Sequence, residues 1–247
     1  MTKISGKIFF TVFAAVIALA LSCSAFSCTA KQHQNGITVA IDAGHQLKAD
    51  YSKEPIGPGA KATKARVSSG AEGIATHAPE YQLNLKNSEQ LKQELESRGY
   101  KVIMSRETND VSVSNRERTE NACRAGADIV LHIHANAIGS DQSRDMHGAM
   151  TLCITKSNPF HSSLYEKSRC LADTVLDSLT LATGAKKIGV WETDTMSGLN
   201  WSTVPAATVE VGYMTYAPED ELMQTAAYQK KIAAGIADGI DKYFGRR

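Results

Sequence analysis

The segment ITVAIDAGH at residues 37–45 decides the fold of this chain. Its first five residues are predominantly apolar and β-branched, and a glycine turn stops the run. A short apolar run that ends in such a turn is typical of a buried central strand of a parallel sheet. Because Gly44 lets the backbone turn sharply, the segment predicts that the imidazole of His45 lies at the end of this strand.

Outward from this segment, predicted strands alternate with predicted helices. Strands are expected at 100–104, 128–134, 148–154 and 206–211, and helices are expected to begin near residues 79, 114, 161, 218 and 225. This alternation predicts an α/β fold, a single three-layer domain with a mostly parallel twisted sheet and helices on both faces.

Residues 46–79 interrupt the pattern. They are rich in Gly, Ala, Ser, Lys and Pro and poor in large apolar side chains. We expect no regular secondary structure there, and an unstructured stretch of this length is usually functional or mobile.

The amino-terminal residues differ in composition from the rest of the 247-residue chain. Lys3 and Lys7 precede an almost wholly apolar run at 9–21. This order is typical of a secretory signal, and the apolar run is short for a membrane span. We expect a signal peptide or lipoprotein signal at 1–28, a linker at 29–36 and one domain at 37–247. A lipid on Cys23, or an uncleaved anchor, remains an alternative for attachment to a membrane.

Charge and cysteine content exclude several classes of protein. The net charge is +1, from 27 basic and 26 acidic residues, so nothing indicates a nucleic-acid partner. No Cys-x-x-Cys pair is present among the five cysteines, which argues against a structural zinc knuckle. Cys153 and Cys170 could form a disulfide in an oxidising compartment or stay as buried thiols.

Histidines at 132 and 134 are the most unusual feature of a predicted strand. Residues two apart on a strand point to the same face, and histidine is uncommon in a buried parallel strand. His134, nearer the strand end, is the better candidate for a metal ligand. His132 could support a ligand or be an ordinary hydrogen-bonded core residue.

Two glutamates and His45 are predicted at the same rim, because ligands of such sheets gather beyond the carboxyl ends of the strands. Each has an ordinary alternative. Glu80 in a first helical turn could simply complement the helix dipole. Glu210, within an apolar strand, could be a general base with a raised pKa, or a salt-bridge partner of Arg106.

Four segments, in order, carry a family resemblance: VAIDAGH at 39–45, PEYQLNL at 79–85, HIHANA at 132–137 and VEVGY at 209–213. Together they closely resemble the zinc-dependent N-acetylmuramoyl-L-alanine amidases of bacterial cell walls. The resemblance extends from residue 37 to about residue 243.

The resemblance implies one Zn²⁺ per chain, held by His45, Glu80 and His134, with Glu210 as the catalytic carboxylate. It implies hydrolysis, by a zinc-activated water, of the amide between N-acetylmuramic acid and L-alanine of peptidoglycan. The expected protein is an exported, monomeric enzyme of the cell envelope. Alternatives are a zinc peptidase acting on the stem peptide and a non-catalytic peptidoglycan-binding module.

The chain departs from the family pattern at three positions. Ala43 stands where the family often has Pro, Gln46 where it often has Gly, and His132 where it often has Ser. The sequence assigns no residue to substrate binding.

Overall fold

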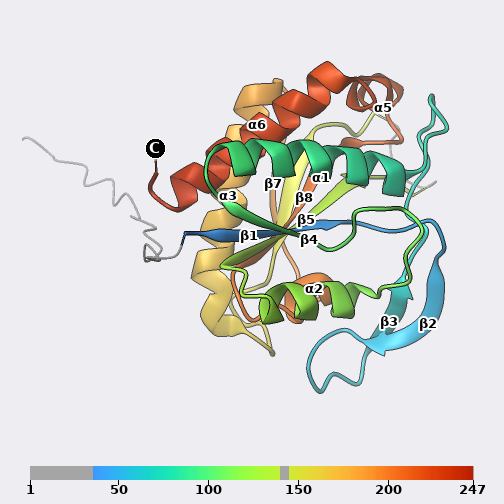
Figure 1. Ribbon diagram of the computed structural model, residues 1–247. Coiled ribbons are helices and arrows are strands. Elements are labelled where there is room, and N and C mark those ends of the chain that lie inside the picture. Colours follow the sequence, from blue (N-terminus) through green and yellow to red (C-terminus); the bar gives the residue numbers. More distant parts are fainter. Residues whose placement is uncertain (1–35, 140–144, 247) are drawn as a thin grey trace, which may run out of the picture.

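A six-stranded sheet forms the centre of the computed structural model, which describes residues 36–139 and 145–246 (Figure 1). The expected signal peptide, and all of the expected linker except Gly36, lie outside the described residues. In spatial order the strands are β4 (Lys101–Met104), β1 (Thr38–Ala43), β5 (Ile129–Asn136), β8 (Ala206–Tyr213), β6 (Ala149–Cys153) and β7 (Lys187–Glu192).

The sheet is mostly parallel, as the sequence predicts. β4, β1, β5 and β8 run in one direction, whereas β6 pairs antiparallel with β8 and parallel with β7. The carboxyl ends of β1, β5 and β8 therefore meet at one edge of the sheet. His45 follows the first of these strands, and the other two carry His134 and Glu210.

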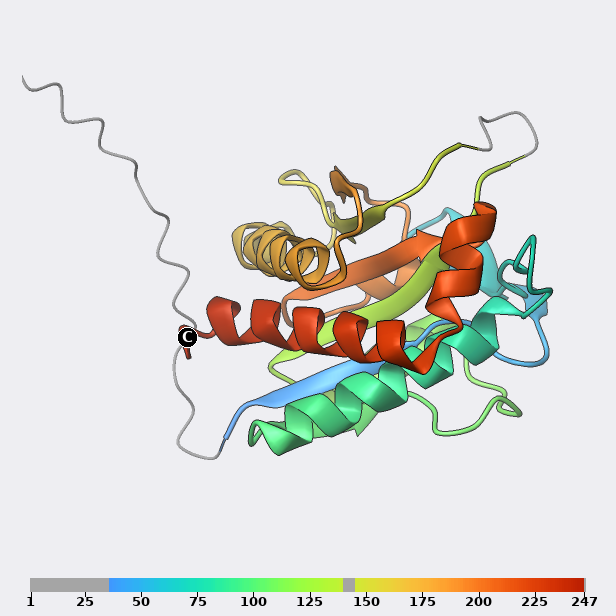
Figure 2. The same ribbon diagram turned by 90° about the horizontal axis from the view of Figure 1, so that it is seen from above.

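Helices cover both faces of the sheet, which confirms the three-layer α/β domain. Three long helices pack together on one face: α1 (Glu80–Ser97), α3 (Tyr165–Thr183) and α6 (Ala226–Tyr243) (Figures 1 and 2). The other face is covered by α2 (Asn115–Arg124) and the single-turn α4 (Ser197–Asn200). A 3₁₀ turn (Ser162–Leu164) precedes α3, and α5 (Ala217–Met223) follows β8.

Two apolar cores follow from the alternation of side chains along each strand. On β5, Ile129, Leu131 and Ile133 face the large core beneath α1, α3 and α6. Val130, between them, faces the small core beneath α2 and α4. His132 and His134 share the face of Val130, so both imidazoles lie beyond the small core.

The expectation for residues 46–79 is wrong in part. The structure has an antiparallel hairpin there, formed by β2 (Asp50–Pro55) and β3 (Thr63–Val67). Its strands carry mainly polar side chains, so an apolar alternation could not reveal them. Glu54 and Val67 are its two buried strand residues.

Local signals in the sequence explain several element boundaries. Ser114 caps α2 and forms the predicted capping box with Glu117. Pro79 precedes α1, with Glu80 in the first turn. The sequence analysis did not identify β7 or α4, both of which are short. Cys153 is a buried free thiol, so the alternative of a disulfide between Cys153 and Cys170 does not hold. Within the described ranges, no helix has both the length and the apolar content needed to cross a bilayer.

Candidate metal centre and its pocket

Three of the predicted site residues converge at the carboxyl edge of the sheet. One nitrogen or oxygen atom from each of His45, Glu80 and His134 lies within 4.8 Å of those of the other two. His45 Nε2 is 3.1 Å from Glu80 Oε2, and His134 Nδ1 is 3.1 Å from Glu80 Oε1. The two imidazole rings meet edge to face, with centroids 4.8 Å apart. The structure therefore places two imidazoles and one carboxylate around one point.

His45 is held by an unusual local backbone. Its φ of 62° lies in the left-handed region, which non-glycine residues seldom adopt. Two buried arginines fix this turn by donating to its carbonyls: Arg106 to Ala43 and Gly44, and Arg118 to Ala43 and His45. A Cβ on Gly44 would collide with the His134 ring. The glycine therefore permits the turn that follows β1 to lie close to β5.

Hydrogen bonds to the other ring nitrogen and to the carboxylate orient these groups. His45 Nδ1 lies 2.9 Å from the carbonyl oxygen of Ser68, which accepts its proton and leaves Nε2 directed at Glu80. Glu80 also accepts bonds from Ala71 N and Asn84 Nδ2. Partners of this kind fix the orientation and tautomer of metal-binding side chains.

The charge states of Glu80 and His134 suit a cation. Burial alone would raise the pKa of Glu80, but hydrogen bonds from His134 and His45 hold it well below its usual range. Burial lowers the pKa of His134, which favours its neutral, metal-binding form. Burial also acts to lower the pKa of His45, but the contact with Glu80 outweighs it and raises that pKa.

Glu210 lies beside this group, on the neighbouring strand. It is the direct neighbour of His134 across β5 and β8, on strands roughly 4.8 Å apart. Its buried Oε2 accepts no hydrogen bond within the described part of the chain. Burial, with a further contribution from Glu80, raises the pKa of Glu210 to about 8. A buried carboxylate with a raised pKa is typical of an active site.

The suggested pairing of Glu210 with Arg106 is wrong. Arg106 donates instead to the carbonyls of the His45 turn, to Tyr81 O and to Asn109. His77, three residues before Glu80, is not part of this group: its side chain is 77% exposed and lies 3.4 Å from Glu72.

His132 belongs to a buried polar chain rather than to the three converging residues. Its Nδ1 lies 2.9 Å from Asp42 Oδ2, and Asp42 Oδ1 accepts from Arg118 and Ser105. Burial would raise the pKa of Asp42, but Arg118 and the bond with His132 hold it well below its usual range. His132 is therefore held by an ionised carboxylate, and its Nε2 has no hydrogen-bond partner in the part of the chain that the structure describes.

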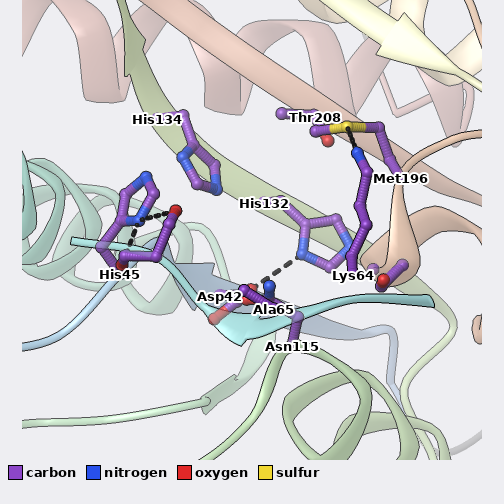
Figure 3. Close-up of a pocket in the computed structure, with 12 residues that line it drawn as sticks. Asp42, His45, Lys64, Ala65, Asn115, His132, His134, Met196 and Thr208 are labelled. Carbon is purple, nitrogen blue, oxygen red and sulfur yellow. Dashed lines mark hydrogen bonds and ion pairs between the residues drawn. The ribbon is translucent and has the colours of Figure 1, made fainter. Parts of the chain in front are cut away.

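A pocket of about 230 Å³ adjoins the metal-ligand candidates (Figure 3). Besides His45, His132 and His134 it is lined mainly by residues that the sequence analysis did not identify. These come from β3, from the segment around α4 and from the start of α2, and include Lys64, Met196, Ser197, Gly198 and Asn115. The hairpin and α4 were not predicted from the sequence, so nothing pointed to these side chains.

An α/β domain with two imidazoles, a carboxylate and a free buried carboxylate at one sheet edge has the design of a metal-dependent hydrolase. Comparison with known proteins defines the class further. Residues 39–242 match the Amidase_3 family, described as N-acetylmuramoyl-L-alanine amidase. The chain belongs to this family, whose activity is the hydrolysis of an amide bond in peptidoglycan.

Individual relatives agree with this assignment. N-acetylmuramoyl-L-alanine amidase LytC of Bacillus subtilis is 28% identical over 85% of the chain. The chain spans only about a third (36%) of the length of LytC. The crystal structure of the apo form of Ami1 from Mycobacterium abscessus superposes with a TM-score of 0.75 at 27% identity, covering 84% of this chain and 98% of that one. The catalytic domain of CwlV from Paenibacillus polymyxa gives 0.68 at 25% identity, covering 85% and 99%.

Proposed function

We propose that His45, Glu80 and His134 hold one zinc ion and that Glu210 is the catalytic base of a peptidoglycan amidase. The geometry of the donor set supports zinc. Ligand atoms at about 2.1 Å from a tetrahedral zinc lie roughly 3.4 Å apart. In the structure each imidazole lies 3.1 Å from a different oxygen of Glu80, and one donor atom from each of the three residues lies within 4.8 Å of the other two. Two nitrogens and one oxygen are also the ligand types of many catalytic zinc sites.

Bound zinc would polarise the carbonyl oxygen of the scissile amide and lower the pKa of a water molecule towards about 7. The residues of the chain account for the other steps. Glu210 accepts the proton of the attacking water and returns it to the nitrogen of the leaving L-alanine. A bound cation would lower the pKa of Glu210 from about 8, so that the carboxylate is charged when the water attacks.

One observation carries the proposal. Three metal-binding atoms converge within 4.8 Å, and Oε2 of the carboxylate on the neighbouring strand has no partner among the described residues. A structural ion pair would satisfy Glu210, and a simple binding module has no use for a buried unpaired carboxylate, which is costly to bury.

The substrate follows from the family. We infer that the chain cleaves the amide between the lactyl group of N-acetylmuramic acid and L-alanine. We also infer that residues 37–247 are the catalytic domain, and that the protein is exported to the cell envelope as a monomer. The signal at residues 1–28 and a lipid on Cys23 remain predictions. Mass spectrometry of the mature amino terminus tests both.

Product analysis tests the proposed reaction. Purified protein loaded with one equivalent of zinc is incubated with peptidoglycan, and the soluble products are analysed by mass spectrometry and by labelling of new amino termini. An amidase releases stem peptides with a free L-alanine amino terminus and leaves intact muramic acid. New amino termini on other stem residues would instead indicate a peptidase. A complete absence of new amino termini would contradict any catalytic function.

A further inference from the structure

The pocket beside the metal centre has a second end, and its chemistry is not needed for the reaction itself. His45 and His134 line one end. Lys64 of β3 and Met196, which precedes α4, line the other. In Figure 3 the His132 imidazole lies between the His134 ring and the Lys64 side chain. A substrate group next to the scissile bond therefore has access to Lys64.

Lys64 is a cation without a counterion among the residues that the structure describes. The neighbour recorded for its ammonium is Met196 Sδ at 4.0 Å, a weak acceptor. Other cations around the pocket are paired: Arg66 with Asp50 and Glu117, and Arg118 with Asp42. Lys64 is an exposed residue, and the partial burial of its ammonium lowers its pKa. An anionic ligand would supply the missing partner.

The floor of the pocket provides a second, independent indication of a polar ligand. Two buried atoms there lack hydrogen-bond partners within the described ranges, His132 Nε2 and Ser197 Oγ. Both residues are more than nine-tenths buried, at 3% and 5% exposed. The Nδ1 atom of the His132 ring is bonded to Asp42, which leaves Nε2 as the ring nitrogen without a partner among the described residues. Buried polar atoms are normally satisfied, so this pair calls for a partner.

Gly198 keeps the floor close to the imidazole. A Cβ at this position would lie 2.6 Å from His132 Cε1 and 2.9 Å from its Nε2. Only glycine therefore lets the start of α4 pack against this ring. The pocket, about 230 Å³, is smaller than the 300–1,000 Å³ of most small-molecule sites, so it accommodates a fragment of one or two residues.

We propose that Lys64 binds a free carboxylate of the stem peptide, located on the residue that follows the released L-alanine. The enzyme therefore prefers stem peptides that carry this carboxylate over stem peptides that carry a carboxamide in its place. The inference rests on the proposed amidase function. The glycan strand next to the scissile bond offers no carboxylate, because the lactyl carboxyl is itself the amide that is cleaved. The carboxylate must therefore come from the peptide side. His132 Nε2 and Ser197 Oγ then hydrogen-bond to polar groups of the bound peptide.

Matched substrates test this specificity. Two synthetic muramyl peptides are used, identical except that the second stem residue carries either a free carboxylate or a carboxamide. We expect wild-type kcat/KM to favour the carboxylate substrate by about fivefold, the upper range for a partly exposed ion pair. We expect the difference to lie mainly in KM. Calorimetric binding of the two corresponding stem peptides to the zinc-loaded protein should show the same order.

Two substitutions at Lys64 and one control make the test specific. Lys64→Met keeps the length of the side chain and should reduce the ratio to about one, whereas Lys64→Arg should keep the preference. Lys61→Met removes the same charge from the exposed turn of the same hairpin, outside the pocket lining, and should leave the ratio unchanged.

The possible outcomes separate the two proposals. Equal turnover of both substrates by the wild type, a preference for the carboxamide, or a preference that survives Lys64→Met would overturn the role of Lys64 while leaving the amidase proposal intact. Turnover of neither substrate by the zinc-loaded wild type would contradict the amidase function itself.

Discussion

The two faces of the central sheet differ in how far their apolar side chains extend along the strands. Facing α1, α3 and α6, β5 is apolar along its length, with Ile129, Leu131 and Ile133 fully buried. On the opposite face of the same strand, Val130 is followed by His132 and His134. One strand therefore stabilises the domain with one set of alternate residues and builds the site with the other.

Neighbouring strands repeat this division. On β1, Ala40 of the small core is followed on the same face by Asp42. On β8, Ala206 is followed by Thr208 and Glu210. The small core therefore ends where the polar site begins. The large core continues beneath the site and holds the backbone in place, so stability and chemistry should respond to different substitutions.

Loss of a proposed metal ligand should have the largest effect. His134→Ala removes one of the three converging side chains, so we expect loss of bound zinc and of all zinc-dependent turnover. Elemental analysis of the purified variant measures the first and peptidoglycan release the second. His77→Ala is a suitable control, because His77 is exposed and points to Glu72, and it should keep one equivalent of zinc. A His134→Ala protein that retained one equivalent would disprove the ligand set.

A substitution on the opposite face of the same strand should affect stability instead. Leu131 is 0% exposed in the large core, so Leu131→Ala should lower the free energy of unfolding by about 2–5 kcal/mol. Zinc content and kcat of the folded fraction should stay near the wild-type values. Leu181→Ala, at a site 81% exposed, should change stability little. Denaturant unfolding measures both variants. If Leu131→Ala lost zinc without losing stability, the two faces would not be separable.

A further prediction concerns the dependence of stability on pH in the zinc-free protein. The folded state raises the pKa of Glu210 from 4.5 to about 8, so between these values the folded protein binds a proton that the unfolded chain has lost. The contribution of Glu210 to stability should therefore fall as pH rises, by at most about 1.4 kcal/mol per unit.

Glu210→Gln cannot ionise and should lose none of this stability. Both proteins are treated with a chelator. From pH 5 to pH 8, the unfolding free energy of the variant should thus rise relative to that of the wild type. A difference that stayed constant over this range would show that Glu210 is not held in its protonated form.

Much of this arrangement could be predicted from the sequence, because strands and caps leave local signals. The apolar run at 37–41 and the two histidines of β5 identified the central strands, and the Ser114 capping box located α2. Since the carboxyl ends of parallel strands share one edge, the side chains of the proposed site were expected together.

The far end of the pocket could not be predicted in the same way. Lys64 lies on a hairpin of largely polar strands, which gives no apolar alternation. Met196 and Ser197 belong to a segment with a single helical turn. Their approach to His132 depends on tertiary packing against Gly198, and no local pattern reports that contact. The partners of Arg106 were misjudged for the same reason, since its backbone acceptors are distant in sequence.

The central claim is that Glu210, which is not a metal ligand, transfers the proton of the attacking water at a site formed by three metal-binding side chains. It is tested most directly by measuring zinc content and peptidoglycan turnover of Glu210→Gln in parallel, with Glu221→Gln on the surface of α5 as the matched control. The account predicts that Glu210→Gln keeps one equivalent of zinc while its rate falls by about a hundred- to ten-thousand-fold, and that the control matches the wild type. Near-wild-type turnover by zinc-loaded Glu210→Gln would contradict it.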